Sequence, residues 1–369
     1  MTNPKEGSPA SQDGYDVLRR ENALMLAPRL VIHTAFGHKD SMLIPAATVA
    51  IHPSQFPEQL HGELVSSLRQ GKLNPKFLYD SVRQTQKWLG LHAACSPTRT
   101  DPKVSAIYNL GFEQAVANLK FRSVHVIGLG CGGGTKDTRL LRLLQKRGFR
   151  ALYTPCDVST AMVLTARQAA LKVIDDKQCF PLVCDLAQAE DLPKWFCSRP
   201  SPFVPRLFTF FGMIPNFEPK VILPKLAALV RRRDLLLFSA NLAPGQDYAA
   251  GVRHILPQYD NAWTRDWLMS FLIGLGVAPR AGELKFGVEL EPNKGLRRVV
   301  AHFYFRRPQE IEIDTDRIRF QPKRPLRLFF SYRHTPDGIS KLLARHGLEV
   351  REHWVAASKE EGVFLCRKK

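Results

Sequence analysis

The 369-residue sequence lacks the features of secreted, metal-binding and membrane-spanning proteins. Its seven cysteines are an odd number without framework spacing, which favours reduced thiols in a cytosol. No paired His/Cys spacing indicates a metal site. The polar N-terminus, residues 1–14, has no apolar core of a signal peptide. The longest apolar stretch, residues 267–279, is broken by Ser270, Gly274 and Gly276 and is too short to span a bilayer. We expect a cytoplasmic protein without a membrane partner.

Acidic residues are scarce: 34 Asp and Glu stand against 53 Lys and Arg, a net charge of +19. Such an excess can indicate nucleic acid, an anionic surface or an acidic ligand. The basic residues are spread along the chain, however, and no aromatic-interleaved RNA motif accompanies them. A soluble basic surface is therefore favoured over a nucleic-acid-binding face. The hydrophobic fraction of 44% is that of an ordinary globular protein.

The most informative stretch is residues 124–157. A short, mostly β-branched run is followed by five glycines within residues 128–134, a helix pattern with an apolar face, and a second strand that ends in Asp157. The glycines, Gly128, Gly130 and Gly132 among them, permit a tight turn close to a ligand. The acid can accept hydrogen bonds from ribose hydroxyls. Dinucleotides and S-adenosylmethionine (SAM) both match this unit, and a plain structural turn also remains open.

The following pattern alternates between strands and helices. It predicts a helix over 159–174, a strand over 181–184 before Asp185, a strand over 206–211, a helix over 218–230 and a strand over 234–240. This alternation indicates a doubly wound parallel sheet of the α/β class. The chain ends with a helix over 336–346 and a hairpin of strands 348–355 and 361–367. A terminal antiparallel hairpin is typical of the SAM-dependent methyltransferase fold and not of dinucleotide dehydrogenases.

Two other regions depart from this alternation. Before it, the patterns predict a strand over 30–33, an apolar run over 42–51, a helix over 58–70, a helix start at 74–80, a loop over 95–101 and a helix over 102–118. After strand 234–240, residues 241–274 are helical in parts, and strands are expected over 285–291, 297–305 and 324–332. We therefore predict a disordered tail (1–14), an α+β substrate-binding domain (15–100 and 241–333) and a SAM-binding Rossmann-like domain (101–240 and 334–369).

Several motifs in order resemble the histidine Nα-methyltransferases of ergothioneine biosynthesis and their relatives acting on tryptophan and dimethylallyltryptophan. They are NPKFLYD (74–80), SPTRTD (96–101), GLGCGGGTKDTR (128–139), YTPCDVS (153–159), FFGMIPNFEP (210–219), QYDN (258–261) and FSYRHTP (330–336). The resemblance runs from about residue 74 to the C-terminus. It implies a class I methyltransferase fold and SAM as cofactor.

The resemblance also implies site residues. Gly128, Gly130, Gly132 and Lys136 would lie near the methionine part of SAM, Asp157 would hold the ribose, and Asp185 with Leu186 would contact the adenine. Asn216 and Tyr259 match the pair that holds the substrate carboxylate, and Tyr79 matches a tyrosine beside the α-amino group. Structural alternatives stay open: Asn216 could end a turn, the tyrosines could be core residues, and Lys136 could be a surface residue at a helix start.

The sequence departs from the family at the positions that read the imidazole. Phe329 stands at a glutamate position, with Ser331 kept, and Cys95 stands at a tyrosine position. A phenylalanine cannot bind a ring N–H as a carboxylate does. We therefore predict an N-methyltransferase for an amino acid or small amine with an apolar or aromatic side chain, and not for histidine. Two alternatives remain: a nucleic-acid methyltransferase, although an NPPY-type motif is absent, and a non-catalytic ligand-binding relative.

Overall fold

The computed structural model describes residues 46–198, 203–291 and 295–369. From Thr48 to the C-terminus the chain forms one compact unit. The tail expected at 1–14, the strand expected at 30–33 and the first four residues of the apolar run at 42–51 lie outside the described residues. No helix of the described part is long and apolar enough to cross a membrane.

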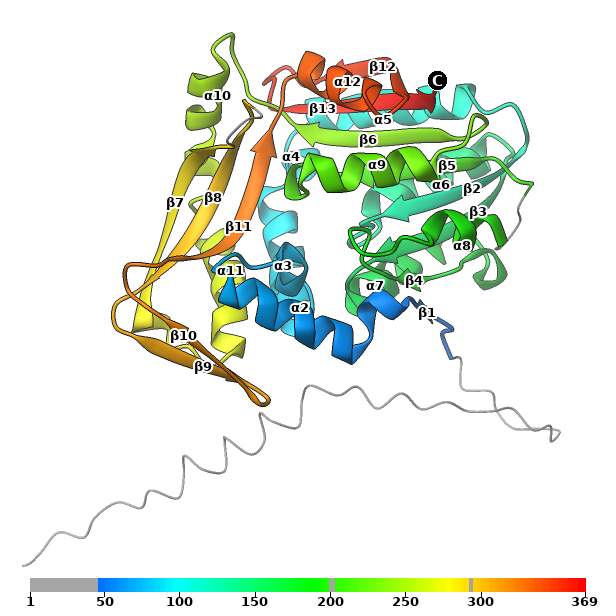
Figure 1. Cartoon of the computed structure of the whole chain (residues 1–369). Coiled ribbons are helices and arrows are strands. Elements are labelled where there is room, and N and C mark those ends of the chain that lie inside the picture. Colours follow the sequence, from blue (N-terminus) through cyan, green and yellow to red (C-terminus); the bar gives the residue numbers. More distant parts are fainter. Residues whose placement is uncertain (1–45, 199–202, 292–294) are drawn as a thin grey trace, which may run out of the picture. The chain divides into compact units, whose positions relative to one another are not determined.

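The larger sheet has eight strands in the order β1-β4-β3-β2-β5-β6-β13-β12 (Figure 1). The strands are β1 (Ala50–Ile51), β2 (Ser123–Leu129), β3 (Arg150–Asp157), β4 (Leu182–Val183), β5 (Arg206–Phe211), β6 (Leu235–Asn241), β12 (Leu348–Val355) and β13 (Glu361–Lys368). From β1 to β6 all neighbours are parallel. β13 runs antiparallel to β6 and pairs with β12. The predicted doubly wound sheet with its C-terminal hairpin is confirmed.

Helices cover both faces of this sheet. α5 (Pro102–Ala117), α6 (Thr135–Lys146) and α7 (Thr160–Ala170) contribute to one buried core. α8 (Leu192–Ser198), α9 (Pro219–Leu229) and α12 (Pro336–Ala344) contribute to the core on the other face. Ser159 caps α7, as predicted, because its side chain accepts a hydrogen bond from the Met162 amide. α7 ends at Ala170, four residues before the predicted end.

A second group of elements surrounds its own core. It contains α2 (Pro57–Arg69), α3 (Val82–Cys95), α11 (Ala262–Gly274) and the antiparallel sheet β11-β8-β7, of β7 (Gly282–Leu290), β8 (Arg297–Phe305) and β11 (Leu326–Arg333). The short helix α10 (Tyr248–His254) contacts β8 at the side of this group. Figure 1 shows these three strands side by side, apart from the larger sheet. One core joins Leu68 of α2, Leu268 of α11 and Phe303 of β8. The division of the chain into two domains stays a prediction.

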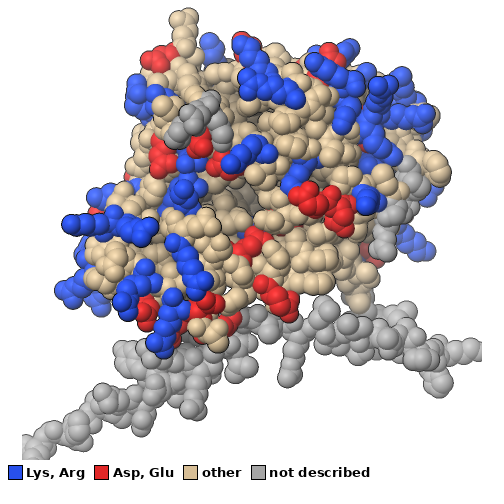
Figure 2. Space-filling model, viewed as in Figure 1, with Lys and Arg blue, Asp and Glu red and all other residues tan. Residues whose placement is uncertain are grey.

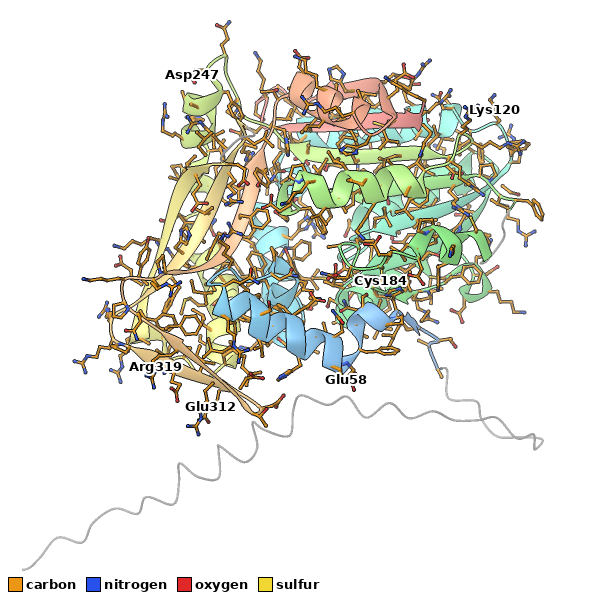
Figure 3. The ribbon with its side chains drawn as sticks, viewed as in Figure 1. Glu58, Lys120, Cys184, Asp247, Glu312 and Arg319 are labelled. Atoms are coloured by element: carbon orange, nitrogen blue, oxygen red, sulfur yellow. The ribbon has the colours of Figure 1, made fainter. Side chains whose placement is uncertain are left out.

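Two local expectations were wrong, and one hairpin was missed. Asn74 does not start a long helix: it caps the short 3-10 helix η2 (Pro75–Leu78), and α3 begins after Ser81, whose side chain and that of Gln84 form a capping box. Pro97–Thr100 forms one helical turn, α4, where a loop was expected. The hairpin of β9 (Gln309–Ile313) and β10 (Asp316–Phe320) was not predicted. Its charged side chains, Glu312 and Arg319 among them, point into solvent (Figure 3).

Candidate active site

A cavity of about 650 Å³ lies where the parallel strands end at their carboxyl termini, the usual ligand position in a sheet of this kind. Its wall contains eleven of the predicted site residues: Tyr79, Cys95, Gly130, Gly132, Lys136, Asp157, Asp185, Asn216, Tyr259, Phe329 and Ser331. Two others, Gly128 and Leu186, are not among the lining residues that the structure describes. Leu186 is buried in the core below Asp185. Segments from both parts of the chain therefore meet around one cavity.

The glycine turn after β2 has left-handed backbone at Gly130 (φ 65°) and Gly132 (φ 51°). A side chain at Gly130 would overlap Met213, whose sulfur lies 2.7 Å from the position a Cβ would take. Gly128 has a different role, because a Cβ there would come within 2.2 Å of the Asp137 carboxylate. Gly128 thus makes room for a buried acid, and Gly130 and Gly132 form the open cradle.

Asp157 at the end of β3 fastens this turn. One carboxylate oxygen accepts a hydrogen bond from the Gly132 amide at 3.0 Å, and the other accepts from the Ser159 amide at 3.1 Å. Burial raises the pKa of this carboxyl. A carboxylate fixed by two amides at the end of the second strand, next to a glycine cradle, meets the requirements of a ribose-bearing cofactor such as SAM.

Asp185, after β4, is tied to the N-terminal segment. Its carboxylate lies 3.0 Å from the ammonium of Lys76, which also lies 2.8 Å from Glu63. Lys76 and Asp185 both line the cavity, so this ion pair brings η2 against the end of the larger sheet. The sequence analysis did not single out Lys76, although it stands within the NPKFLYD motif.

Lys136 lies at the start of α6 against aromatic rings. Its ammonium is 4.7 Å from the centroid of the Tyr108 ring and 5.9 Å from that of Phe211. Burial lowers the pKa of Lys136, and the nearby carboxylates of Glu361 and Asp137 oppose that shift. The alternative of a plain surface lysine does not match this environment, because the side chain faces the cavity.

Aromatic side chains build the wall of the cavity on the side of α3 and β11. Ring centroids are 5.4 Å apart for Tyr79 and Trp267, 5.9 Å for Trp267 and Phe329, and 6.0 Å for Phe329 and Tyr259. Trp88 extends the row, 5.9 Å from Tyr79. Trp267 is fixed, since its indole N–H donates to the Leu78 carbonyl at 3.0 Å. Cys95 lies at the exposed rim of this wall.

Tyr259 is the centre of a polar network beside this wall. Its hydroxyl donates to the Ser331 hydroxyl at 2.9 Å and accepts from the Arg333 guanidinium at 2.8 Å. The Asn241 amide lies 3.4 Å from the same oxygen. Asn216 lies in η4 (Ile214–Asn216), which packs against β11, and its side chain lines the same cavity. The structure thus brings Asn216, Tyr259 and Ser331 together around one cavity.

Sequence reasoning missed Trp88, Trp267, Asn241 and Arg333, all of which line the cavity. A signal for Arg333 was present. Phe329, Ser331 and Arg333 alternate along β11, and alternate residues of a strand share one face. The predicted strand ended at residue 332, so Arg333 was left outside it.

A comparison with protein families agrees with this geometry. Residues 60–368 match the family described as histidine-specific, SAM-dependent methyltransferases. A comparison with curated proteins gives no match.

Among solved structures, magnesium protoporphyrin IX methyltransferase from Synechocystis, crystallised with SAH, is 14% identical with a TM-score of 0.43, over 78% of this chain and 95% of that one. The CcbJ methyltransferase from Streptomyces caelestis is 14% identical with a TM-score of 0.39, over 80% and 99%. The 1,6-didemethyltoxoflavin N1-methyltransferase of Burkholderia thailandensis is 10% identical with a TM-score of 0.39, over 77% and 87%.

The family match covers most of the chain, and the strand order and the terminal hairpin are those of a class I methyltransferase sheet. The chain therefore belongs to the histidine-specific, SAM-dependent methyltransferase family, and SAM is its cofactor.

Proposed function

We propose that this methyltransferase transfers a methyl group to the α-amino nitrogen of an amino acid with an apolar or aromatic side chain, and that histidine is not its preferred substrate. The observation that carries the proposal is Phe329. It is buried in the aromatic wall between Tyr259 and Trp267, at the position where the resemblance expects a glutamate.

The wall explains this preference. An imidazole placed against rings would have no carboxylate to accept its N–H, and an unpaired buried polar group costs about 1–3 kcal/mol. An indole or phenyl ring gains apolar contact and favourable edge or offset stacking, about 0.5–1.5 kcal/mol per pair. Together these effects favour an aromatic acceptor over histidine. Ser331 can still donate its O–H to a ring nitrogen, but its oxygen already accepts from Tyr259 and carries no negative charge to hold a ring N–H.

The chemistry is a displacement in which bound SAM supplies an activated methyl group. The chain's own residues hold the acceptor in line and present an amine with a free lone pair. Asn216 and Tyr259 are suited to orient the carboxylate, since an amide and a phenol can both donate hydrogen bonds. Burial, with a contribution from Asp157, raises the pKa of Tyr79 above its usual value. Tyr79 therefore stays a neutral phenol, whose oxygen can accept a hydrogen bond from the amine and orient it.

The test has two steps. Calorimetry measures SAM binding, and mass spectrometry then screens the twenty amino acids for methylated products. We expect tryptophan or another aromatic amino acid to be methylated faster than histidine. A preference for histidine would contradict our interpretation of Phe329 and Cys95. Methylation of RNA without methylation of any amino acid would favour the nucleic-acid alternative, and SAM binding without any transfer would favour the non-catalytic one.

The variant Phe329→Glu sharpens this test. A carboxylate at this place would accept a ring N–H, so kcat/KM for histidine should rise while that for tryptophan falls. Leu328→Met is the matched control, because Leu328 is buried beside it but is not among the described lining residues of the cavity. An unchanged substrate order in Phe329→Glu would show that this residue does not select the substrate.

We further propose a small-molecule substrate and a cytoplasmic location. All seven cysteines are free thiols, although the sulfurs of Cys156 and Cys184 lie only 3.1 Å apart, which favours a reducing compartment. Lys and Arg side chains are spread over the visible face and do not gather at one place on it (Figure 2). This distribution supports a small acceptor better than a nucleic acid.

A further inference from the structure

Arg333, at the end of β11, places a buried positive charge beside the cavity. The residue is 5% exposed and lines the cavity. Its guanidinium donates to the Tyr259 hydroxyl at 2.8 Å and to the backbone carbonyls of Leu242 at 3.2 Å and Glu360 at 3.4 Å. All of these acceptors are neutral. Its Nε atom is buried without a partner among the described residues.

The nearby acids do not neutralise this charge by direct contact. The Glu360 carboxylate accepts from Gln258 at 3.1 Å, and the Glu361 carboxylate accepts from the Tyr108 hydroxyl. Within the described parts of the chain, Arg333 forms no ion pair with a carboxylate. The adjacent His334 is neutral at pH 7, because burial and the Arg333 charge lower its pKa to about 4.

A guanidinium keeps its proton at any physiological pH. A buried charge is costly unless it is paired, and buried charges in proteins are accordingly paired with a counter-ion. We expect the bound acceptor to supply the counter-ion, because the guanidinium contacts the hydroxyl of Tyr259 and both residues line the cavity. The hydrogen bond that Arg333 donates to the phenol oxygen polarises the O–H bond of Tyr259, and the tyrosine hydroxyl therefore donates more strongly. That single O–H, which donates to Ser331 in the structure, is then a stronger donor when it turns to a bound carboxylate.

We propose that Arg333, acting through Tyr259, selects acceptors that carry a carboxylate. This inference rests on the proposed function and deepens it, by naming the residue that makes the carboxylate of the acceptor a requirement. Asn216 and Tyr259 are neutral, and Arg333 is the cation that donates directly to the Tyr259 hydroxyl. A decarboxylated amine would leave the guanidinium without a counter-ion and would add its own ammonium. Arg333 is a specificity and positioning residue and takes no part in the methyl transfer itself.

The experiment compares acceptor pairs that differ only in the carboxylate: L-tryptophan with tryptamine, and L-phenylalanine with phenethylamine. Calorimetry on the SAH-loaded protein measures binding, and initial rates measure kcat/KM. We expect the wild type to prefer the amino acid at least about 100-fold, because a site built for a polar group rejects the analogue that lacks it. Arg333→Met should reduce the preference about tenfold or more, while Arg333→Lys keeps part of it.

Two controls distinguish the effect of losing the Arg333 charge from the effect of a disturbed fold. Arg327→Met removes a guanidinium that lines the same cavity and lies over Phe330, 5.0 Å from its ring centroid, and should leave the preference unchanged. Affinity for SAM and the melting temperature should change little in Arg333→Met, since the effect is directed at the acceptor.

The outcomes distinguish this inference from the proposed function. Equal use of tryptamine and tryptophan by the wild type would overturn the inference and leave the N-methyltransferase proposal standing. A carboxylate preference that survives in Arg333→Met would also overturn it. Carboxylate-dependent binding to the SAH-loaded protein that Arg333→Met abolishes, without methylation of any amino acid, would support the inference and refute the proposed function. No binding by either amino acid would overturn the inference.

Discussion

Gly134, the last residue of the glycine turn, lies where the helices α6 and α7 approach each other closely. Its backbone is left-handed (φ 69°), and a Cβ there would lie 2.7 Å from Cα of Ala166 in α7. Gly134→Ala should therefore destabilise the protein by at least about 2 kcal/mol, from the left-handed conformation and overpacking together. Denaturant unfolding followed by circular dichroism measures the change.

The matched control is Gly62→Ala in α2. This glycine is exposed in a helix interior, and nothing lies within 4 Å of the position a Cβ would take. Alanine should stabilise the protein there by about 0.5–1 kcal/mol, because glycine is the poorer helix former. Equal and small effects at both positions would show that α6 and α7 do not approach each other as closely as described.

At the scale of residues, the positions of side chains at strand ends could be predicted and their long-range partners could not. Asp157 was predicted because an acid after a second strand has a recognisable position relative to the glycine turn. The partner of Asp185 was not, since Lys76 lies 109 residues earlier and nothing local connects them. Arg333 lay one residue beyond the predicted strand, although its period-two relation to Phe329 and Ser331 was visible.

At the scale of elements, η4 and the sheet β11-β8-β7 are connected by a charged cluster. Glu218, two residues after Asn216, has one carboxylate oxygen 3.1 Å from Arg298 of β8, and the other accepts from the Tyr332 hydroxyl at 2.9 Å. Arg298 is largely buried and also pairs with Glu289 at 3.0 Å. These contacts hold the loop that carries Asn216 against the sheet that carries Ser331.

Glu218→Gln should weaken that connection without removing the side chain. A charge-assisted hydrogen bond contributes about 1.5–3 kcal/mol and part of it would be lost, so KM for the acceptor should rise about 3- to 10-fold. KM for SAM should stay unchanged, because Asp157 and the glycine turn lie on other elements. Steady-state kinetics with each substrate varied in turn measures both.

Glu289→Gln is the comparison for this variant. It also removes an ion pair of Arg298, but Glu289 lies on β7, away from the Asn216 loop. Its acceptor KM should remain near the wild-type value. If both variants raise the acceptor KM equally, the cluster supports the sheet as a whole and does not position Asn216.

Elements with strong local signals were predicted closely. β5 and β8 match their predicted ranges, since each is a buried run rich in apolar residues that starts after a turn. The hairpin β9-β10 was missed because Glu and Arg alternate with its apolar residues and its turn, at Asp314 (φ 49°), has no glycine. The 3-10 helix η2 was read as a helix start, because the Asn-Pro capping signal is the same for both.

At the scale of the whole molecule, the arrangement of segments could be anticipated only in outline. The core around β8 combines residues of α2, such as Leu68, with residues 200 or more positions later, such as Leu268 and Phe303. Composition and periodicity show that each segment has an apolar face, but not which faces meet. The cavity, and therefore the aromatic wall, depends on those long-range contacts.

His334 makes the stability of the whole molecule sensitive to acid. It is 1% exposed, and both ring nitrogens lack side-chain or backbone partners in the described part of the chain. Burial and Arg333 lower its pKa to about 4, against about 6.5 in an unfolded chain. Its contribution to stability is therefore complete above pH 6.5 and is lost as the pH falls from 6.5 to about 4, since the unfolded chain binds the proton first.

His334→Phe should remove this sensitivity. The difference of about 2.5 pKa units corresponds to about 3 kcal/mol at most. Between pH 6.5 and 4, the unfolding free energy of the variant should therefore fall by up to about 3 kcal/mol less than that of the wild type. At pH 7.5 it should be at least as stable, because two unpaired buried nitrogens are gone.

His125→Phe provides the contrast: His125 is also buried, with its pKa lowered to about 3, but its ring bonds to Thr154 at 2.9 Å. That variant should cost about 1 kcal/mol at pH 7.5. Urea unfolding across this pH range measures all three proteins, and identical acid profiles for the wild type and His334→Phe would contradict a neutral, buried His334.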